Sequence, residues 1–317
     1  MKPAYLIIIC FTTCIFSASA QSNVTVPFTQ IGKLIVINGS VDGREGNFIV
    51  DTGIPGLILN SRFFKGNSID VPFSDLNGKK VEAVGVLKYL HIQNMEILAK
   101  GLVIDLSKLE KNIGIPIHGL IGTRVFRKFE LFVDLESMEL TLIRLKSGQI
   151  RHRYTVPPID TLDFFWKGYM VCLKMKFGGK NLYLGLDTGA EISLITPTLE
   201  SRLKGNISPM RATVRVVGFG EFESYKRLNI LENVQLKDQL TMRIPFLYHS
   251  MYELNQQFSG PRLHGLIGYQ PFGATRFAIN FVKKEIYLWR HNLKNRRIHE
   301  LESRLAQKNA TPFLSFF

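Results

Sequence analysis

The tripeptide Asp-Thr-Gly occurs twice in this chain, at residues 51–53 and 187–189, and each copy directly follows an apolar segment. Both segments end the same larger pattern, which is a strand-like stretch, a glycine-containing turn and a second strand-like stretch. Residues 33–50 carry this pattern in the first half and residues 169–186 carry it in the second. A single carboxylate in such a turn is common, but two in matching contexts indicate a paired acid that shares one proton.

A second repeated block lies downstream of each tripeptide. Residues 118–122 and 264–268 both have the sequence His-Gly-Leu-Ile-Gly. Asp134 and Asn280 each lie 12 residues after the last glycine of their block, and the strand-like residues around them align without a gap. Five identical residues with gapless flanks predict an internal duplication.

The repeat and the length of 317 residues predict two domains. Alternating apolar and polar residues in both copies are typical of strands, so we expect an all-β fold. We place the first domain at residues 21–150 and the second at residues 151–292, with a basic, proline-containing join near residues 146–167. Residues 293–317 are predicted to form a short amphipathic helix and an apolar tail, which either packs against the body or docks a partner.

Residues 1–20 have the features of a secretory signal peptide. Lys2 supplies a positive charge, residues 6–16 are mostly apolar, and residues 18–20 have the small-x-small form of a cleavage site. We therefore predict an exported protein, periplasmic or secreted, with an uncleaved N-terminal anchor as the alternative. No other stretch is long and apolar enough to cross a bilayer, so no transmembrane segment is predicted in the mature chain.

Removal of this signal would leave Cys172 as the one cysteine. It lies in an apolar strand pattern, and we expect it to be a buried apolar side chain rather than a nucleophile. With a single cysteine no intrachain disulfide can form, so the fold must be stabilised by core burial.

The formal net charge of the chain is +14. Such a charge can attract acidic substrates, nucleic acid or anionic lipid. The basic residues are dispersed, however, and no nucleic-acid motif with interleaved aromatic residues is present. We therefore interpret the charge as a solvated surface and predict no nucleic-acid partner.

At the two repeated motifs the chain resembles the aspartic peptidases, specifically the retropepsin-like group. The family pattern is an apolar strand leading into Asp-Thr-Gly and, some tens of residues later, two apolar residues and a glycine. Residues 120–122 and 266–268 match that second element. The resemblance covers roughly residues 28–145 and 165–290. It implies two tandem retropepsin-like β-barrel lobes that form a bilobal, pepsin-like pseudo-dimer, active as a monomer on a peptide or protein substrate and without a cofactor or metal.

The resemblance also assigns roles to individual residues. It implies that Asp51 and Asp187 are the catalytic pair, one from each lobe. Hydroxyl and glycine residues would support the two catalytic turns; these are Thr52, Gly53, Thr188 and Gly189. Two apolar loops would seat the turns; these are Leu120, Ile121, Gly122, Leu266, Ile267 and Gly268.

The family covers its cleft with a β-hairpin flap, and two glycine-containing segments are candidates for it. The first contains Gly85, and the second contains Gly218, Phe219 and Gly220. Glycine at a hairpin tip would permit the bending that closure over a peptide requires. An ordinary hairpin turn is an equally good interpretation of both segments.

The residues that follow the two Asp-Thr-Gly turns differ in how well they fit the family pattern. The first catalytic turn continues with Ile54 and Pro55, and Ile54 is bulky while Pro55 has no N–H donor, which could affect the positioning of Asp51. In the second turn Ala190 fits the family, and Glu191 either contacts substrate, raises the pKa of the aspartate pair by its like charge, or faces solvent.

His118 and His264 occupy matched positions before the two apolar loops. Two histidines without further ligands at metal-binding spacing make a poor zinc site, so we expect them to form hydrogen bonds beside these loops. The sequence thus predicts an aspartic endopeptidase. A catalytically silent relative that binds a peptide or protein partner in the same cleft is the alternative, and a structural envelope protein is a third possibility.

Overall fold

The computed structural model describes residues 23–66, 71–74, 78–145, 154–217, 223–237 and 240–289. The predicted signal peptide at residues 1–20 and the predicted helix and tail at residues 293–317 lie outside these ranges. The fold is mostly β with short helices between strands, so the prediction of an all-β chain is confirmed. No helix among the described residues has the length and apolar character needed to span a membrane.

Six strands of the first half close into a barrel in which each strand pairs with two others. The order around the barrel is β2, β3, β9, β4, β8 and β7, and β7 pairs again with β2. The strand bounds are β2 Leu34–Val41, β3 Arg44–Val50, β4 Leu57–Asn60, β7 Val84–Ile92, β8 Met95–Ile104 and β9 Gly119–Ile121.

Strands of the second half pair in the same order. Here β13, β14, β19, β15, β18 and β17 follow one another, and β17 returns to β13 through the pair Lys176 and Gln235. The bounds are β13 Met170–Phe177, β14 Lys180–Leu186, β15 Ser193–Ile195, β17 Glu223–Lys237, β18 Leu240–Tyr248 and β19 Gly265–Ile267. An additional strand, β16 (Ile207–Val217), pairs with β17.

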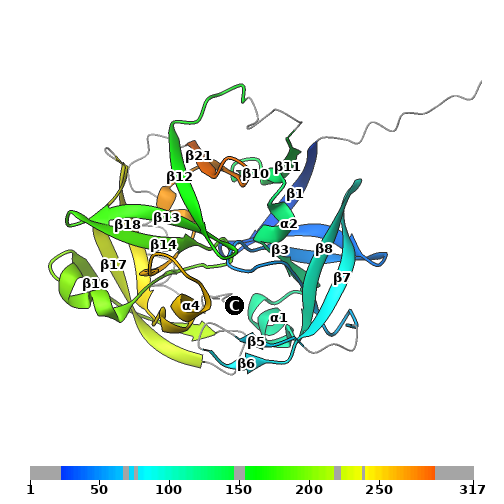
Figure 1. Cartoon of the computed structure of the whole chain (residues 1–317), viewed down its shortest axis with the longest axis horizontal. Helices are drawn as coiled ribbons and strands as arrows, with labels where there is room; N and C mark the ends of the chain where they lie inside the picture. The colour runs from blue at the N-terminus through cyan, green and yellow to red at the C-terminus, as the bar shows by residue number, and fades with distance from the viewer. Residues whose placement is uncertain are drawn as a thin grey trace, which may run out of the picture.

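A third antiparallel sheet joins the two halves and lies above both in Figure 1. Its order is β1, β11, β10, β20, β21 and β12, so β10 and β20 meet in the middle. Strands β1 and β12 continue into the first and the second barrel. The bounds are β1 Asn23–Ile31, β10 Phe129–Asp134, β11 Glu139–Arg144, β12 Asp160–Lys167, β20 Arg276–Asn280 and β21 Glu285–Trp289.

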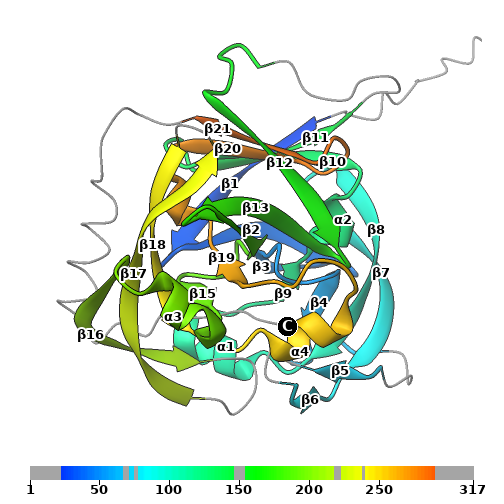
Figure 2. The same ribbon diagram turned by 60° about the vertical axis from the view of Figure 1, so that its left-hand side comes forward.

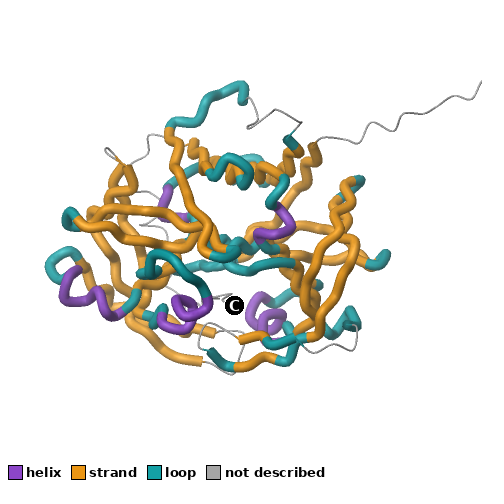
Figure 3. Tube along the Cα trace, viewed as in Figure 1, coloured by secondary structure: helices purple, strands orange, loops and turns teal. Residues whose placement is uncertain are grey.

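Short helices and one small hairpin complete the described chain, and Figure 3 shows how little of the trace is helical. The helices are α1 Ser107–Ile113, α2 Thr123–Phe126, α3 Glu200–Leu203 and α4 Tyr252–Gln257, with 3₁₀ turns η1 Pro197–Leu199 and η2 Gln270–Phe272. The hairpin consists of β5 (Phe73–Ser74) and β6 (Lys80–Val81). In Figure 2, α2 lies beside the joining sheet, and the other helices lie around the lower part of the two barrels.

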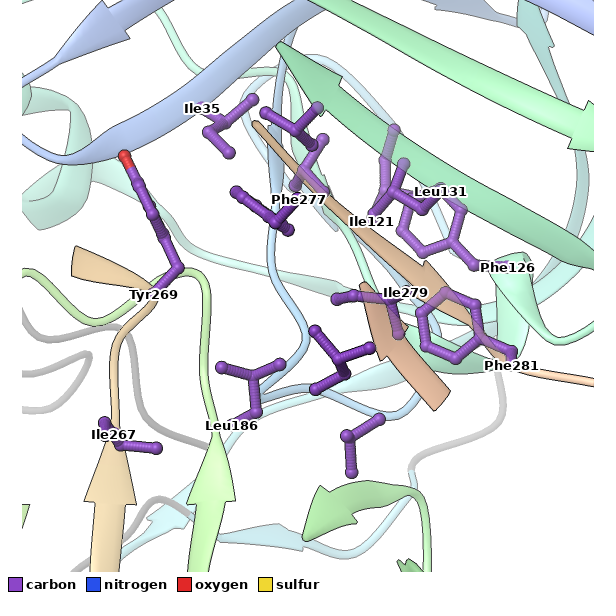
Figure 4. Packing of buried hydrophobic residues seen from close by; sticks show 14 of the residues in the cluster. Ile35, Ile121, Phe126, Leu131, Leu186, Ile267, Tyr269, Phe277, Ile279 and Phe281 are labelled. Carbon is purple, nitrogen blue, oxygen red and sulfur yellow. The ribbon is translucent and has the colours of Figure 1, made fainter. Parts of the chain in front are cut away.

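The largest apolar cluster contains side chains from both halves (Figure 4). Phe126 of the first half stacks on Phe281 of the second, with ring centroids 6.1 Å apart. Burial of such apolar surface stabilises the arrangement at roughly 25 cal/mol per Å². Cys172 is fully buried and unpaired, which confirms its predicted role as an apolar side chain.

Polar pairs tie the two central strands of the joining sheet together. Glu130 of β10 is fully buried and accepts hydrogen bonds from Asn280 of β20 and from the Tyr154 hydroxyl, both at 2.6 Å. At the other end of the same strand pair, Asp134 accepts a bond from Arg276 at 2.6 Å. A buried carboxylate needs such donors, because leaving it without them costs several times the net value of one bond.

We expect the Asn280→Leu substitution to destabilise the protein by roughly 2–3 kcal/mol, because Glu130 loses a buried donor. Chemical denaturation of the purified protein measures this change. Asn181→Leu, at an exposed position, is the control and should change the free energy of unfolding by less than about 0.5 kcal/mol. Equal stabilities of the two variants would contradict the role of the Glu130 pair.

Candidate active site

The two Asp-Thr-Gly turns begin where a barrel strand ends. Asp51 follows β3 and Asp187 follows β14, and each of these strands runs parallel to the short strand of its own apolar loop. This pairing continues into the turns. The Asp51 N–H donates to the Ile121 carbonyl at 3.0 Å, and the Asp187 N–H donates to the Ile267 carbonyl at 2.9 Å. Each aspartate is therefore held by the loop of its own half.

The glycines of the two loops stand where backbone approaches backbone. A Cβ atom added to Gly122 would lie 2.4 Å from the Ile54 carbonyl oxygen, and one added to Gly268 would lie 2.6 Å from the Ala190 carbonyl oxygen. The earlier glycines of the loops, Gly119 and Gly265, are equally close to the backbone of β4 and β15. The repeated Gly-Leu-Ile-Gly thus allows the two Asp-Thr-Gly turns to lie directly on the loops.

Thr52 and Thr188 connect the two turns through four reciprocal hydrogen bonds. The Thr52 N–H donates to the Thr188 hydroxyl and the Thr188 N–H donates to the Thr52 hydroxyl, both at 3.0 Å. Each hydroxyl then donates at 2.8 Å to a carbonyl of the opposite half, Thr52 to Leu186 and Thr188 to Val50. Both threonines are fully buried. These bonds bring the two aspartates, 136 positions apart in the sequence, to one place.

The carboxyl groups lie at the centre of this arrangement, and both aspartates are fully buried. Gly53 donates its N–H to Asp51 Oδ1 at 2.8 Å, and Gly189 donates to Asp187 Oδ1 at 2.9 Å. A Cβ atom on Gly53 would be 2.6 Å from the Asp187 Cγ. Residue 53 must therefore be glycine for the opposite carboxyl group to approach.

Burial and the neighbouring Asp51 raise the pKa of Asp187 well above its usual range. Desolvation of the charged form is the largest cause, followed by the negative charge of Asp51 and a side-chain hydrogen bond with it. The N–H groups of Gly189 and Ala190 act in the opposite direction but are the smaller effect. Asp187 Oδ2 is itself buried, and within the described residues it has no hydrogen-bond partner.

Tyr169 is a site residue that the sequence analysis did not single out. It is buried in the turn before β13, and this burial, followed by the charges of Asp187 and Asp51, raises the pKa of its phenol. Its ring packs edge-on against Phe258 at a centroid distance of 5.3 Å. The sequence signal was weak because Tyr169 is the first residue of an apolar strand pattern, which indicates only burial.

A second set of cross-half bonds surrounds the threonine pair. Thr123, the residue after the first Leu-Ile-Gly, donates its hydroxyl to the Tyr169 carbonyl of the opposite half at 2.8 Å. Tyr269, the residue after the second Leu-Ile-Gly and labelled in Figure 4, donates its hydroxyl to the Lys33 carbonyl at 2.9 Å. The Lys33 N–H in turn donates to Glu191 Oε1 at 2.7 Å. Glu191 thus contacts the backbone of the first half, so its carboxylate has a structural partner.

The residues after Gly53 pack inward. Ile54 is fully buried in an apolar cluster of the first half, and its carbonyl accepts the Thr123 N–H at 3.1 Å. In the repeat, Ile54 aligns with Ala190 and Pro55 aligns with Glu191. The Ala190 N–H favours the ionised form of Asp187, whereas the N–H that Pro55 lacks aligns with that of Glu191. The departure at positions 54 and 55 therefore removes no donor equivalent to those at Asp187.

His118 and His264 form hydrogen bonds beside the two loops, as predicted. The Nδ1 atoms accept the N–H groups of Asn47 at 3.2 Å and Tyr183 at 3.0 Å, which are matched positions in β3 and β14. Burial is the main cause that lowers the pKa of both imidazoles, so both are neutral near neutral pH. No group of three His, Cys, Asp or Glu side chains that could hold a metal ion occurs in the described ranges.

The prediction of Gly85 as a hairpin tip is wrong. Gly85 is the second residue of β7 and pairs with Leu102 of β8, far from the turn that joins these strands. That turn contains Gln93, which has the positive φ of 51° that a glycine usually supplies. Gly218, Phe219 and Gly220 lie outside the described residues; β16 and β17 pair up to Val217 and Glu223 on either side of them.

Comparison with known proteins gives no further identification. No protein-family model matches the chain, and no match is found among curated proteins.

We expect Thr188→Val to destabilise the protein by roughly 2–4 kcal/mol, because the Thr52 N–H and the Val50 carbonyl lose buried partners. Chemical denaturation measures this loss. Thr188→Ser keeps the hydroxyl and serves as the matched control, with a cost of about 1 kcal/mol or less. If both variants were equally stable, the reciprocal bonds would not hold the turns.

Asp187→Asn should stabilise the folded protein near neutral pH by on the order of 1 kcal/mol or more. The folded-state pKa of Asp187 is raised, so the native state binds more protons than the unfolded state between the two pKa values. Wild-type stability then falls as pH rises through this window, and the asparagine variant lacks this loss. Denaturation measured from pH 3 to pH 8 checks the prediction, with the exposed Asp163→Asn as control. A constant difference between Asp187→Asn and wild type over this range would contradict it.

Proposed function

We propose that this protein is an aspartic endopeptidase, in which Asp51 and Asp187 share one proton and activate a water molecule against a peptide bond. The observation that supports this most strongly is the set of four reciprocal threonine bonds, which place two fully buried carboxyl groups side by side. A purely structural turn does not need a second buried carboxylate against it, because burial of both charges is costly.

The raised pKa of Asp187 suggests how the two groups divide the work. In this proposal Asp187 holds the shared proton and Asp51 is ionised. Asp51 accepts a proton from water as the water oxygen bonds to the carbonyl carbon, and Asp187 gives its proton to the carbonyl oxygen. Collapse of the tetrahedral intermediate breaks the C–N bond. The amine leaves with the proton from Asp51, and the carboxyl product returns the other to Asp187.

The proposal includes the architecture of the retropepsin-like group. The two six-stranded barrels, with identical order of strand pairing, would be tandem lobes of a pseudo-dimer, with boundaries near residues 21–150 and 151–292. The substrate would be a peptide or protein in an extended conformation, and the chain would act as a monomer without a cofactor. Export to the periplasm or the medium is part of the same proposal and depends on the signal-like residues 1–20.

Asp51→Asn and Asp187→Asn should each lower peptide cleavage by about 10²–10⁴-fold, the usual contribution of a general acid or base. Cleavage of a peptide library across pH 3–8 measures this effect, with Asp163→Asn as a variant of equal charge change. Wild-type activity should fall on both sides of its optimum, because one carboxyl group must be ionised and the other protonated. A wild type that binds peptides without cutting them would favour the partner-binding alternative, and full activity in either variant would refute the paired mechanism.

A further inference from the structure

The second half contains a pocket of about 1110 Å³ that is separate from the paired aspartates. It lies between the η1–α3 segment, strands β16 and β17 and the end of β18. None of the residues that line it belongs to the catalytic turns or to the loops that seat them. Figure 2 shows α3, β16 and β17 toward one side of the molecule.

The backbone is irregular where it lines this pocket. The register between β16 and β17 shifts between Pro209 and Thr213, so β16 has more residues in this interval than its partner strand. Pro209 and Arg227 flank the shift and both line the pocket. Such bulges bend a strand and redirect its side chains, and they are over-represented beside functional sites.

Positive charge predominates in the lining. Three cationic side chains contribute to it, Lys204, Lys226 and Arg227, against the single carboxylate of Glu200. Lys204 and Arg227 are exposed, whereas Lys226 is partly buried. An anionic group in the pocket would therefore gain attraction from several directions.

Lys226 is fixed in position by two neutral acceptors. Its Nζ donates to the Tyr248 carbonyl at 2.9 Å and lies 3.2 Å from His249 Nδ1. Burial and the charge of Lys226 lower the pKa of His249 to about 4, so the imidazole is neutral near neutral pH and can accept from the ammonium group. These two contacts orient the ammonium group without supplying a negative charge, and burial lowers the pKa of Lys226 from its usual value.

The Tyr248 hydroxyl adds a hydrogen-bond donor to the same wall. The oxygen atom is buried and has no hydrogen-bond partner within the described residues. A buried hydroxyl without a partner costs roughly 1–3 kcal/mol, and a ligand oxygen that accepts its proton recovers part of this cost.

We propose that this pocket binds a carboxylate, carried either by a small organic acid or by an acidic side chain of a peptide. Arg227 can offer parallel N–H donors to a planar carboxylate, and Lys226 and Tyr248 offer single donors. Inorganic phosphate, which is tetrahedral, tests whether the pocket selects a planar carboxylate or accepts any anion. The volume accommodates more than the carboxylate itself, which permits a ligand of several residues or a di-acid.

Fluorescence polarisation with a fluorescein-labelled tetraglutamate peptide tests this proposal. The full chain carries Asp51→Asn and Asp187→Asn, so the peptide cannot be hydrolysed by the proposed mechanism and the outcome does not depend on the proposed function. We expect saturable binding of tetraglutamate, no binding of tetraglutamine, and competition by glutarate but not by inorganic phosphate at equal ionic strength. If glutarate binds with the same dissociation constant as the peptide, the ligand is a small organic acid. If the peptide binds more tightly than glutarate, the ligand is an acidic peptide segment.

Variants locate the binding within the pocket. Arg227→Gln and Tyr248→Phe should each weaken tetraglutamate binding by about tenfold, because each removes a donor to the carboxylate. The exposed Lys174→Gln, on β13 and outside the pocket, removes the same charge and should leave the dissociation constant unchanged. Denaturation midpoints verify that the variants are folded. Equal affinity in all of these variants, competition by phosphate as strong as that by glutarate, or no binding at all would overturn the proposal.

Discussion

The reciprocal bonding of Thr52 and Thr188 is the interaction on which the geometry of the candidate site depends. Each hydroxyl accepts from one backbone N–H and donates to one backbone carbonyl, so a single side chain satisfies two buried backbone groups. Because every one of these bonds crosses between the halves, the separation of the two carboxyl groups is set by how the barrels meet. The joining sheet and the shared apolar cluster also connect the two halves.

Burial explains why two acidic groups in this position have unusual chemistry. Neither aspartate is exposed, and each carboxyl group accepts the glycine N–H of its own turn. At Asp187 the desolvation of the charged form and the charge of Asp51 outweigh the N–H groups of Gly189 and Ala190, so the pKa of Asp187 is raised. The glycine at position 53 contributes by leaving space for the opposite carboxyl group, because any side chain there would separate the pair.

The sequence predicted the elements better than it predicted their contacts. Apolar periodicity and the repeat located the strands before both turns and the two Leu-Ile-Gly loops, because these depend on local pattern and on short-range pairing. Glu191, Thr123 and Tyr169 could not be assigned, since their partners lie in the other half and no spacing rule connects them. The prediction that Gly85 forms a hairpin tip was wrong for a different reason. The turn between β7 and β8 contains Gln93 at positive φ, so no glycine is present at its tip.

The two turns differ in what holds them, although their aspartates are equivalent in the repeat. After Asp51 the carbonyls of Ile54, Pro55 and Gly56 accept N–H groups from residues 122–124, all within the first half. After Asp187 the corresponding support in the described chain is a 3.5 Å bond from Gln270 to Ala190 and the bond from Lys33 to Glu191, which crosses between halves. The residues after Asp51 are therefore held within the first half, whereas one of the two bonds after Asp187 crosses between the halves. The second turn is thus tied to the first half both by the threonine pair and by Glu191.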